Sequence, residues 1–100
     1  MRASLLIVYI DTTITVSGGT GSANIRHIGE IHRIGVVPPG ASAYDMDISD
    51  GDGFGVCGSR NNIGTTTMTV DQPITGLSVL TISNAGNGVY KCRLAISSGI

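Results

Sequence analysis

Four aspartates close together are the residues of this sequence whose type and spacing most directly suggest chemistry: Asp45, Asp47, Asp50 and Asp52. Clustered carboxylates, with glycine to allow a sharp turn, are the ligands that Ca²⁺ prefers. An EF-hand loop beginning at Asp45 needs glycine at its sixth position and glutamate at its twelfth, where this chain has Asp50 and Val56. A less regular calcium site stays open as one interpretation. A solvent-facing strand edge and hairpin turn, built from aspartate and glycine, is the favoured one.

The two histidines, His27 and His32, are the next candidates for metal ligands. They are five residues apart, and an odd separation on one strand places two side chains on opposite faces unless a bulge intervenes. A zinc site needs three or four ligands, and the cysteines lie far away in the sequence. We therefore predict structural or interfacial histidines, with no bound metal and no other cofactor.

The two cysteines, Cys57 and Cys92, could form a disulfide, but free thiols packing as small apolar residues are favoured. The apolar stretch at 5–10 is shorter than the ~7–15 residues of a secretory signal, so we interpret it as a buried first strand. We accordingly expect the protein to be made and folded in a reducing cytoplasm. Cys57 would be a nucleophile only beside a histidine, and no Gly-x-Ser-x-Gly elbow occurs. We predict no catalytic residues and no enzymatic activity.

Charge and hydropathy argue against several other classes of protein. The net charge is −1 and the basic residues are scattered, so capture of nucleic acid is not expected. No apolar run approaches the ~18 residues of a membrane-spanning helix, and we expect no membrane partner. Charged residues make up only 13% of the chain and hydrophobic residues 41%. This shortage of charge predicts that copies or partners cover much of the surface.

The composition points to strands as the elements that must position these residues. The chain has 15 glycines and only one glutamate, Glu30, one lysine, Lys91, and one glutamine, Gln72. β-Branched residues in short apolar runs, separated by Gly, Asn, Pro and Asp, are typical of an all-β protein. We expect one domain over 1–100, a single-domain antiparallel β-sandwich, jelly-roll-like, with about eight short strands.

The expected strands lie at 5–10, 12–17, 25–37, 42–49, 54–58, 65–70, 77–83 and 89–96, with a loop at 60–64. Within 25–37 the isoleucines recur every third residue, which fits neither a strand nor a helix cleanly; a strand with a bulge near Gly29 is favoured over a helix. Phe54 and Val56 are expected on one strand face, and Lys91 and Arg93 on the outside. Two strands alternate clearly enough to predict their inner faces, which comprise Tyr44, Met46 and Ile48 in one and Tyr90, Cys92, Leu94 and Ile96 in the other.

From Tyr44 to Leu94 the chain shows a strand-turn-strand over 44–56, the segments 64–67, 72–77 and 80–85, and a glycine-rich turn before 88–94. This order of elements resembles small virion proteins of tailed bacteriophages, namely the capsid decoration (cement) proteins. The resemblance implies a structural protein, made in the host cytoplasm, that binds the major capsid protein on the capsid surface of the virion. It also implies a homo-oligomer, a trimer ahead of a dimer, and supplies no catalytic residues.

Two further interpretations stay open beside the decoration protein. One is a head–tail or tail accessory protein, and the other, from a different class, is a calcium- or glycan-binding module that uses the four aspartates. For a structural protein we expect contacts through loops and strand edges, with the N-terminal strand pairing with a neighbour. The outward side chains expected to contact other copies are Thr13, Thr15, Thr65, Thr67 and Thr69.

Overall fold

Six strands in one continuous antiparallel sheet make up the described part of the chain. The computed structural model describes residues 7–98, apart from the side chains of Thr75 and Ser98. The strands are β1 (Ile7–Val16), β2 (Gly21–Val37), β3 (Ala43–Asp50), β4 (Gly55–Ile63), β5 (Thr66–Ser83) and β6 (Gly88–Ser98), in the sheet order β1-β6-β2-β5-β3-β4. No helix occurs within these residues, so none there could cross a membrane. The prediction of an all-β antiparallel fold is confirmed.

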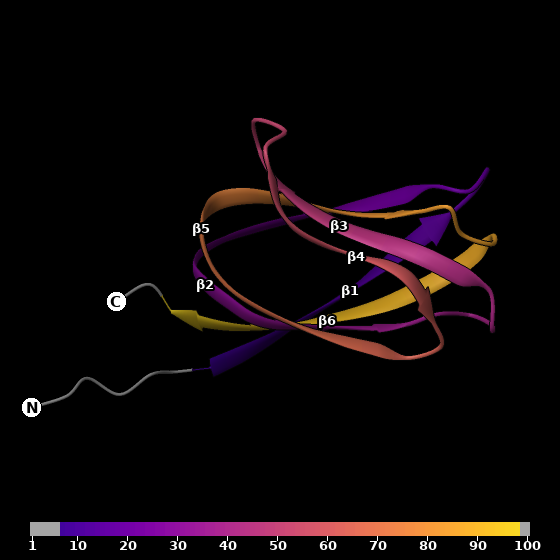
Figure 1. The fold of residues 1–100 in the computed structure, drawn as a ribbon. Helices are drawn as coiled ribbons and strands as arrows, with labels where there is room; N and C mark the ends of the chain where they lie inside the picture. The colour runs from indigo at the N-terminus through magenta and orange to yellow at the C-terminus, as the bar shows by residue number, and fades with distance from the viewer. Residues whose placement is uncertain (1–6, 99–100) are drawn as a thin grey trace, which may run out of the picture.

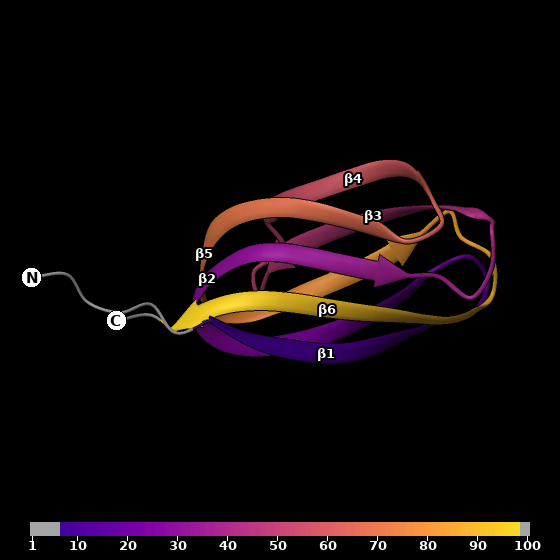
Figure 2. The ribbon, with the colours of Figure 1, turned by 90° about the horizontal axis from the view of Figure 1, so that it is seen from below.

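The single sheet becomes a sandwich because β2 and β5, which are 17 and 18 residues long, bend and serve both layers. The second half of β2 and the first half of β5 lie with β1 and β6 in one layer. The first half of β2 and the second half of β5 lie with β3 and β4 in the other. Figures 1 and 2 show the two layers facing each other, joined at one end by the curved β2 and β5. The expected jelly-roll-like sandwich is thus formed by folding one sheet over.

The bend is located by two glycines with left-handed backbone and by a bulge. Gly29 has a φ of 155° and Gly76 a φ of 141°, values that favour glycine over residues with a Cβ. The pairing of β2 with β5 and with β6 shifts register between Ile31 and Arg33, so that His32 lies at the bulge. A strand with a bulge was predicted near Gly29, and the bulge lies three residues further on.

The bulge also explains the isoleucines that recur every third residue. Ile25 and Ile31 face the core at 5% and 0% exposure, whereas Ile28 points to solvent at 66%. One extra residue at the bulge reverses the inward and outward alternation, so Ile34 is buried again at 0% exposure. The isoleucine pattern therefore arises from two stretches of ordinary strand alternation, one on each side of the bulge, whose inward positions are shifted by one residue.

The strand count is six within the described residues, where we expected about eight. Segments 12–17 and 7–10 form one strand, β1, because Asp11 continues the ladder opposite Arg93. Segments 65–70 and 77–83 belong to one strand, β5, because Pro73 and Gly76 keep their pairing with β2 through the bend. Residues 5 and 6 of the expected first strand lie outside the described residues.

Two local predictions were wrong. The first strand was expected to be buried, but it is a sheet edge whose Ile7 and Tyr9 are 44% and 67% exposed. Phe54 was expected to share a strand face with Val56. Instead β4 begins at Gly55 and continues to Ile63 through the expected loop, and Phe54 lies before it, 72% exposed. The turn is therefore longer than expected and includes Phe54.

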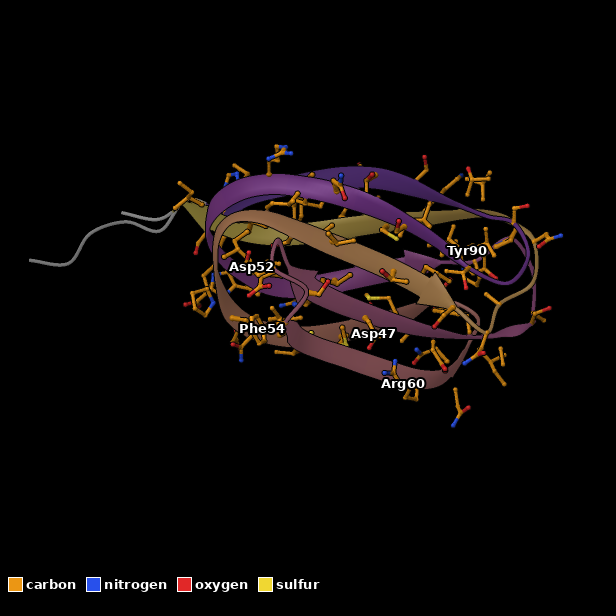
Figure 3. All side chains as sticks on the ribbon, turned by 90° about the horizontal axis from the view of Figure 1, so that it is seen from above. Asp47, Asp52, Phe54, Arg60 and Tyr90 are labelled. Carbon is orange, nitrogen blue, oxygen red and sulfur yellow. The ribbon has the colours of Figure 1, made fainter. Side chains whose placement is uncertain are left out.

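The core lies between the layers and contains both predicted inner faces. Every residue predicted to face inward from 42–49 and 89–96 is at most 3% exposed. Tyr44 of one layer meets Tyr90 of the other edge to face, with ring centroids 5.5 Å apart. Their hydroxyls donate to the carbonyl oxygens of Gly64 and Gly86 at 3.1 and 2.9 Å. Tyr90 lies between the layers, at the end away from the bend (Figure 3).

Candidate functional site

The aspartate-rich segment is a rigid turn rather than a gathering of free carboxylates. Asp50 Oδ1 accepts hydrogen bonds from the backbone nitrogens of Asp52 and Phe54, both at 2.9 Å. Backbone bonds from Asp50 N to Phe54 O (2.9 Å) and from Gly53 N to Asp50 O (3.1 Å) complete the turn. The side chain of Asp50 is therefore already used to hold the backbone, as expected for the hairpin interpretation.

Two of the other three aspartates of the segment, Asp45 and Asp47, lie further back on β3 and have partners of their own. Asp45 accepts hydrogen bonds from Asn61 N and Asn84 Nδ2, both at 2.8 Å, and these bonds hold the pKa of Asp45 below its ordinary value. Asp47 Oδ1 lies 2.8 Å from Arg60 Nη1. Figure 3 shows Asp47 and Arg60 together on the strands and Asp52 with Phe54 at the turn. Within residues 7–98 the four carboxylates do not converge on one point, and no observation favours the calcium-binding interpretation.

The turn between β3 and β4 presents Phe54 to solvent. The turn stands away from the two layers in Figure 1. Phe54 is the most exposed of the large hydrophobic residues described, at 72%, although four hydrogen bonds hold the turn that carries it. An aromatic side chain on a fixed backbone loses little conformational freedom when it docks. The turn is thus a candidate contact surface, and the sequence signal for it was the Asp-Gly pattern alone.

A second candidate surface is the outer face of the layer formed by β1, β6, the second half of β2 and the first half of β5. We call it the threonine face. All five threonines predicted to point outward are exposed on it: Thr13, Thr15, Thr65, Thr67 and Thr69. Lys91 and Arg93 are also exposed there, as predicted, while Cys92 between them is buried. The pattern of alternating residues therefore identified these outward side chains correctly, although the sequence did not show that they share one face.

The threonine face is hollowed along its middle. Two hollows of about 650 and 640 Å³ share Gly35 and Arg93 in their linings. A Cβ at Gly35 would approach only Thr67 Oγ1, at 3.9 Å, so the absence of a side chain there leaves the floor open. The hollows make the face concave enough to receive a protruding side chain.

Two opposite charges on the threonine face, Asp11 and Arg93, neutralise each other. Arg93 Nε and Nη2 donate to Asp11 Oδ1 and Oδ2 at 2.6 and 2.9 Å, a bidentate pair. This pair lowers the pKa of Asp11 and raises that of Arg93. The guanidinium also lies over the ring of Tyr9, 5.5 Å from its centroid. A partner approaching this part of the face meets a paired ion and an aromatic ring instead of an isolated charge.

Both cysteines are free thiols, as predicted. Burial raises the pKa of Cys92 to about 11. Burial, with the nearby charge of Asp47, raises the pKa of Cys57 as well. Because the thiolate is the nucleophile, both shifts make these thiols less reactive at neutral pH.

The structure separates the two histidines and places one of them in a cluster that the sequence did not reveal. His27 shares the inward phase of Ile25 and Ile31, and His32 lies at the bulge. His32 Nδ1 is 3.1 Å from Asp71 Oδ1 and 3.4 Å from Glu30 Oε1. Asp71 follows His32 by 39 positions in the chain. Only the pairing of β2 with β5 brings the three side chains together, and the one local signal was the expected bulge.

Comparison with known proteins identifies no family for this chain. No protein-family model matches the chain, and no curated protein matches its sequence. Seven chains of solved structures match. One belongs to the "Structure of infectious bursal disease virus Gt strain", with 15% sequence identity and a TM-score of 0.33. The match covers 93% of this chain and 30% of that one, so this chain spans about a third of its length. A likeness at this identity and TM-score carries no argument about function.

Proposed function

We propose that the protein is a structural protein of a virion, a decoration (cement) protein that binds the major capsid protein on the assembled head and stabilises it. The order of elements from Tyr44 to Leu94 supports this proposal through its resemblance to phage decoration proteins. The observation that carries it is the turn between β3 and β4. That turn holds Phe54 at 72% exposure on a backbone fixed by four hydrogen bonds.

A binding role accounts for an exposed aromatic in such a place. Burying a phenylalanine in a partner's pocket contributes apolar area, and rigid aromatic anchors dominate many interfaces. The edge strand β1 adds unpaired backbone groups that a neighbouring strand can use. These features match the expectation of contacts through loops and strand edges.

The threonine face is the surface that we assign to contacts between copies of the chain, as a trimer ahead of a dimer. The layer presents four strands side by side, β1, β6, the second half of β2 and the first half of β5, as one continuous surface for such a contact. The exposed threonines and the paired Asp11 and Arg93 bring no net charge to the contact. Lys91 is also exposed on this face, so contacts that keep the Lys91 side chains of neighbouring copies apart avoid strong repulsion.

Binding to heads tests the proposal directly. Purified protein is added to heads assembled from the coat protein encoded in the same genome but lacking this protein. We expect saturable co-sedimentation at micromolar concentration and heads that resist heat better. Gold labelling of intact virions then separates decoration of the head from a position on the tail. Absence of binding, or label only on the tail, contradicts the decoration role.

Sedimentation velocity at about ten micromolar tests self-association. A charge added to the threonine face, in Thr67→Glu, should shift the oligomer toward monomer. Ser22→Glu, at another exposed position on the other layer, is the matched control and should leave the oligomer unchanged. A single species near the chain mass of 10.2 kDa defeats the assignment of this face to self-association, and binding to heads survives that result.

A further inference from the structure

The bend of the sandwich carries a cluster of potential metal ligands that is independent of the proposed virion role. Glu30 and His32 come from β2 and Asp71 from β5. Each side chain offers one ligand atom, and these atoms all lie within 4.8 Å of one another. It is the one such group found among residues 7–98.

The pairing of β2 with β5 is distorted beside His32, and this distortion lets the three side chains point toward one another. Ile31 pairs with Gln72 and Arg33 with Thr69, so β5 has one residue more than β2 between these pairs. Opposite β6 the extra residue is His32 itself. Asp71 has a φ of 49°, a left-handed conformation that aspartate tolerates better than most residues. Bulges of this kind re-aim side chains and are frequent beside functional sites.

The distances fit a small cation. A tetrahedral zinc ion with ligand bonds of about 2.0–2.2 Å has ligand atoms about 3.3–3.6 Å apart. His32 Nδ1 is 3.1 Å from Asp71 Oδ1 and 3.4 Å from Glu30 Oε1, and no pair in the cluster exceeds 4.8 Å. An ion between the three atoms would therefore need only small side-chain movements, with no change in the strands.

The arrangement of the imidazole supports ligation through Nδ1. His32 Nε2 is buried and has no hydrogen-bond partner in the part of the chain that the structure describes, so that edge of the ring faces protein. The Nδ1 edge faces the two carboxylates. The side chains of His32, Glu30 and Asp71 are 27%, 45% and 63% exposed, so an ion can reach them from solvent.

We propose that Glu30, His32 and Asp71 bind a divalent transition-metal cation, with Zn²⁺ as the best match to one imidazole nitrogen and two carboxylate oxygens. Calcium requires six to eight oxygen ligands, and this cluster includes a nitrogen. Three protein ligands leave one position of a tetrahedral ion for water or for a group from a partner. His32 and Asp71 also line one hollow of the threonine face, so that position opens toward the surface assigned to other copies.

Calorimetric titration of the metal-free full chain with ZnCl₂ tests the site. We expect one zinc ion per chain, a melting temperature that rises with zinc, and visible absorption bands when Co²⁺ replaces it. Asp71→Asn and His32→Gln should each weaken zinc binding at least tenfold. His27→Gln, which alters the other histidine, is the matched control and should bind as the unaltered chain does. Millimolar Ca²⁺ should not displace the zinc.

Three results overturn the proposal: no zinc binding by the folded chain, the same affinity in Asp71→Asn, or an equal loss in His27→Gln. The last would show that zinc binding does not depend on this cluster in particular. Circular dichroism confirms that each variant is folded. Should His32→Gln not fold, Glu30→Gln answers the same question, because the Glu30 side chain is nearly half exposed. The titration uses the isolated chain, so its failure leaves binding to heads untouched, and failure of head binding leaves the titration untouched.

Discussion

Removing the aromatic ring at the turn between β3 and β4 should separate binding from folding. Docking of an aromatic side chain buries roughly 150–250 Å². At 72% exposure, Phe54 keeps most of that area available to a partner. At ~25 cal/mol per Å², 72% of that area gives an upper limit of roughly 3–4.5 kcal/mol. Ordering and desolvation reduce this, so we expect Phe54→Ala to cost about 2 kcal/mol of binding free energy, about 30-fold in Kd.

The same substitution should leave the free energy of unfolding within about 0.5 kcal/mol, because the ring contributes little to the core. The assay is co-sedimentation of labelled protein with heads that lack it, over a range of protein concentrations. Urea unfolding followed by circular dichroism runs in parallel. Ile63→Ala is the matched control, since Ile63 is 65% exposed and lies at the far end of β4 from the turn.

The reasoning is refuted by a loss of affinity below threefold in a folded Phe54→Ala protein. It is also refuted by an equal loss in Ile63→Ala, which would show that any exposed apolar side chain contributes alike. A loss of stability above about 1 kcal/mol would mean that the ring supports the turn, contrary to its exposure.

Three further predictions concern the folded chain alone. Gly88→Ala should lower the free energy of unfolding by about 2 kcal/mol in urea titrations, because its φ is 143° and a Cβ would lie 2.7 Å from Pro39 Cγ. Gly35→Ala, whose Cβ would meet only Thr67 Oγ1 at an ordinary 3.9 Å, should change it by less than about 1 kcal/mol. Because burial raises the pKa of Cys92 to about 11, Ellman's reagent at pH 8 should modify this thiol only after unfolding in concentrated urea. Arg93 lowers the pKa of Asp11 in the folded protein, so their ion pair stabilises the fold above the pKa of the unfolded chain, near 3.8. This contribution is lost as the pH falls through the lower pKa of the folded protein. The difference in melting temperature between the unaltered chain and Asp11→Asn should therefore close below pH 3.8.

The sequence predicted the features that depend on local alternation. Tyr44, Met46 and Ile48 could be assigned to the core, because a period of two along a half-buried strand is visible in the sequence. The exposed threonines followed from the same rule. Strand ends were predicted less well, because Pro73 and Gly76 are usual turn residues and here lie inside a strand. Here they lie where β5 curves, and the pairing of β5 with β2 continues through them. Whether such residues end a strand or only bend it depends on the partner strand.

The cluster of Glu30, His32 and Asp71 could not be predicted for a related reason. Asp71 joins His32 only through a register that carries one extra residue in β5, and that register is set by the whole length of the paired strands. The sequence indicated a bulge in 25–37 but not which residue of β5 would lie opposite it. Long-range pairing is the information that local patterns lack.

The two layers of the sandwich are joined at both ends. At one end β2 and β5 pass from layer to layer, so the backbone joins the layers there. At the other end Tyr44 of β3 and Tyr90 of β6 join the layers through their rings and through hydroxyls bonded to backbone carbonyls. Phe54 and the threonine face lie outside these connections. Substitutions there should change what the protein binds, whereas loss of either tyrosine ring should loosen the layers themselves.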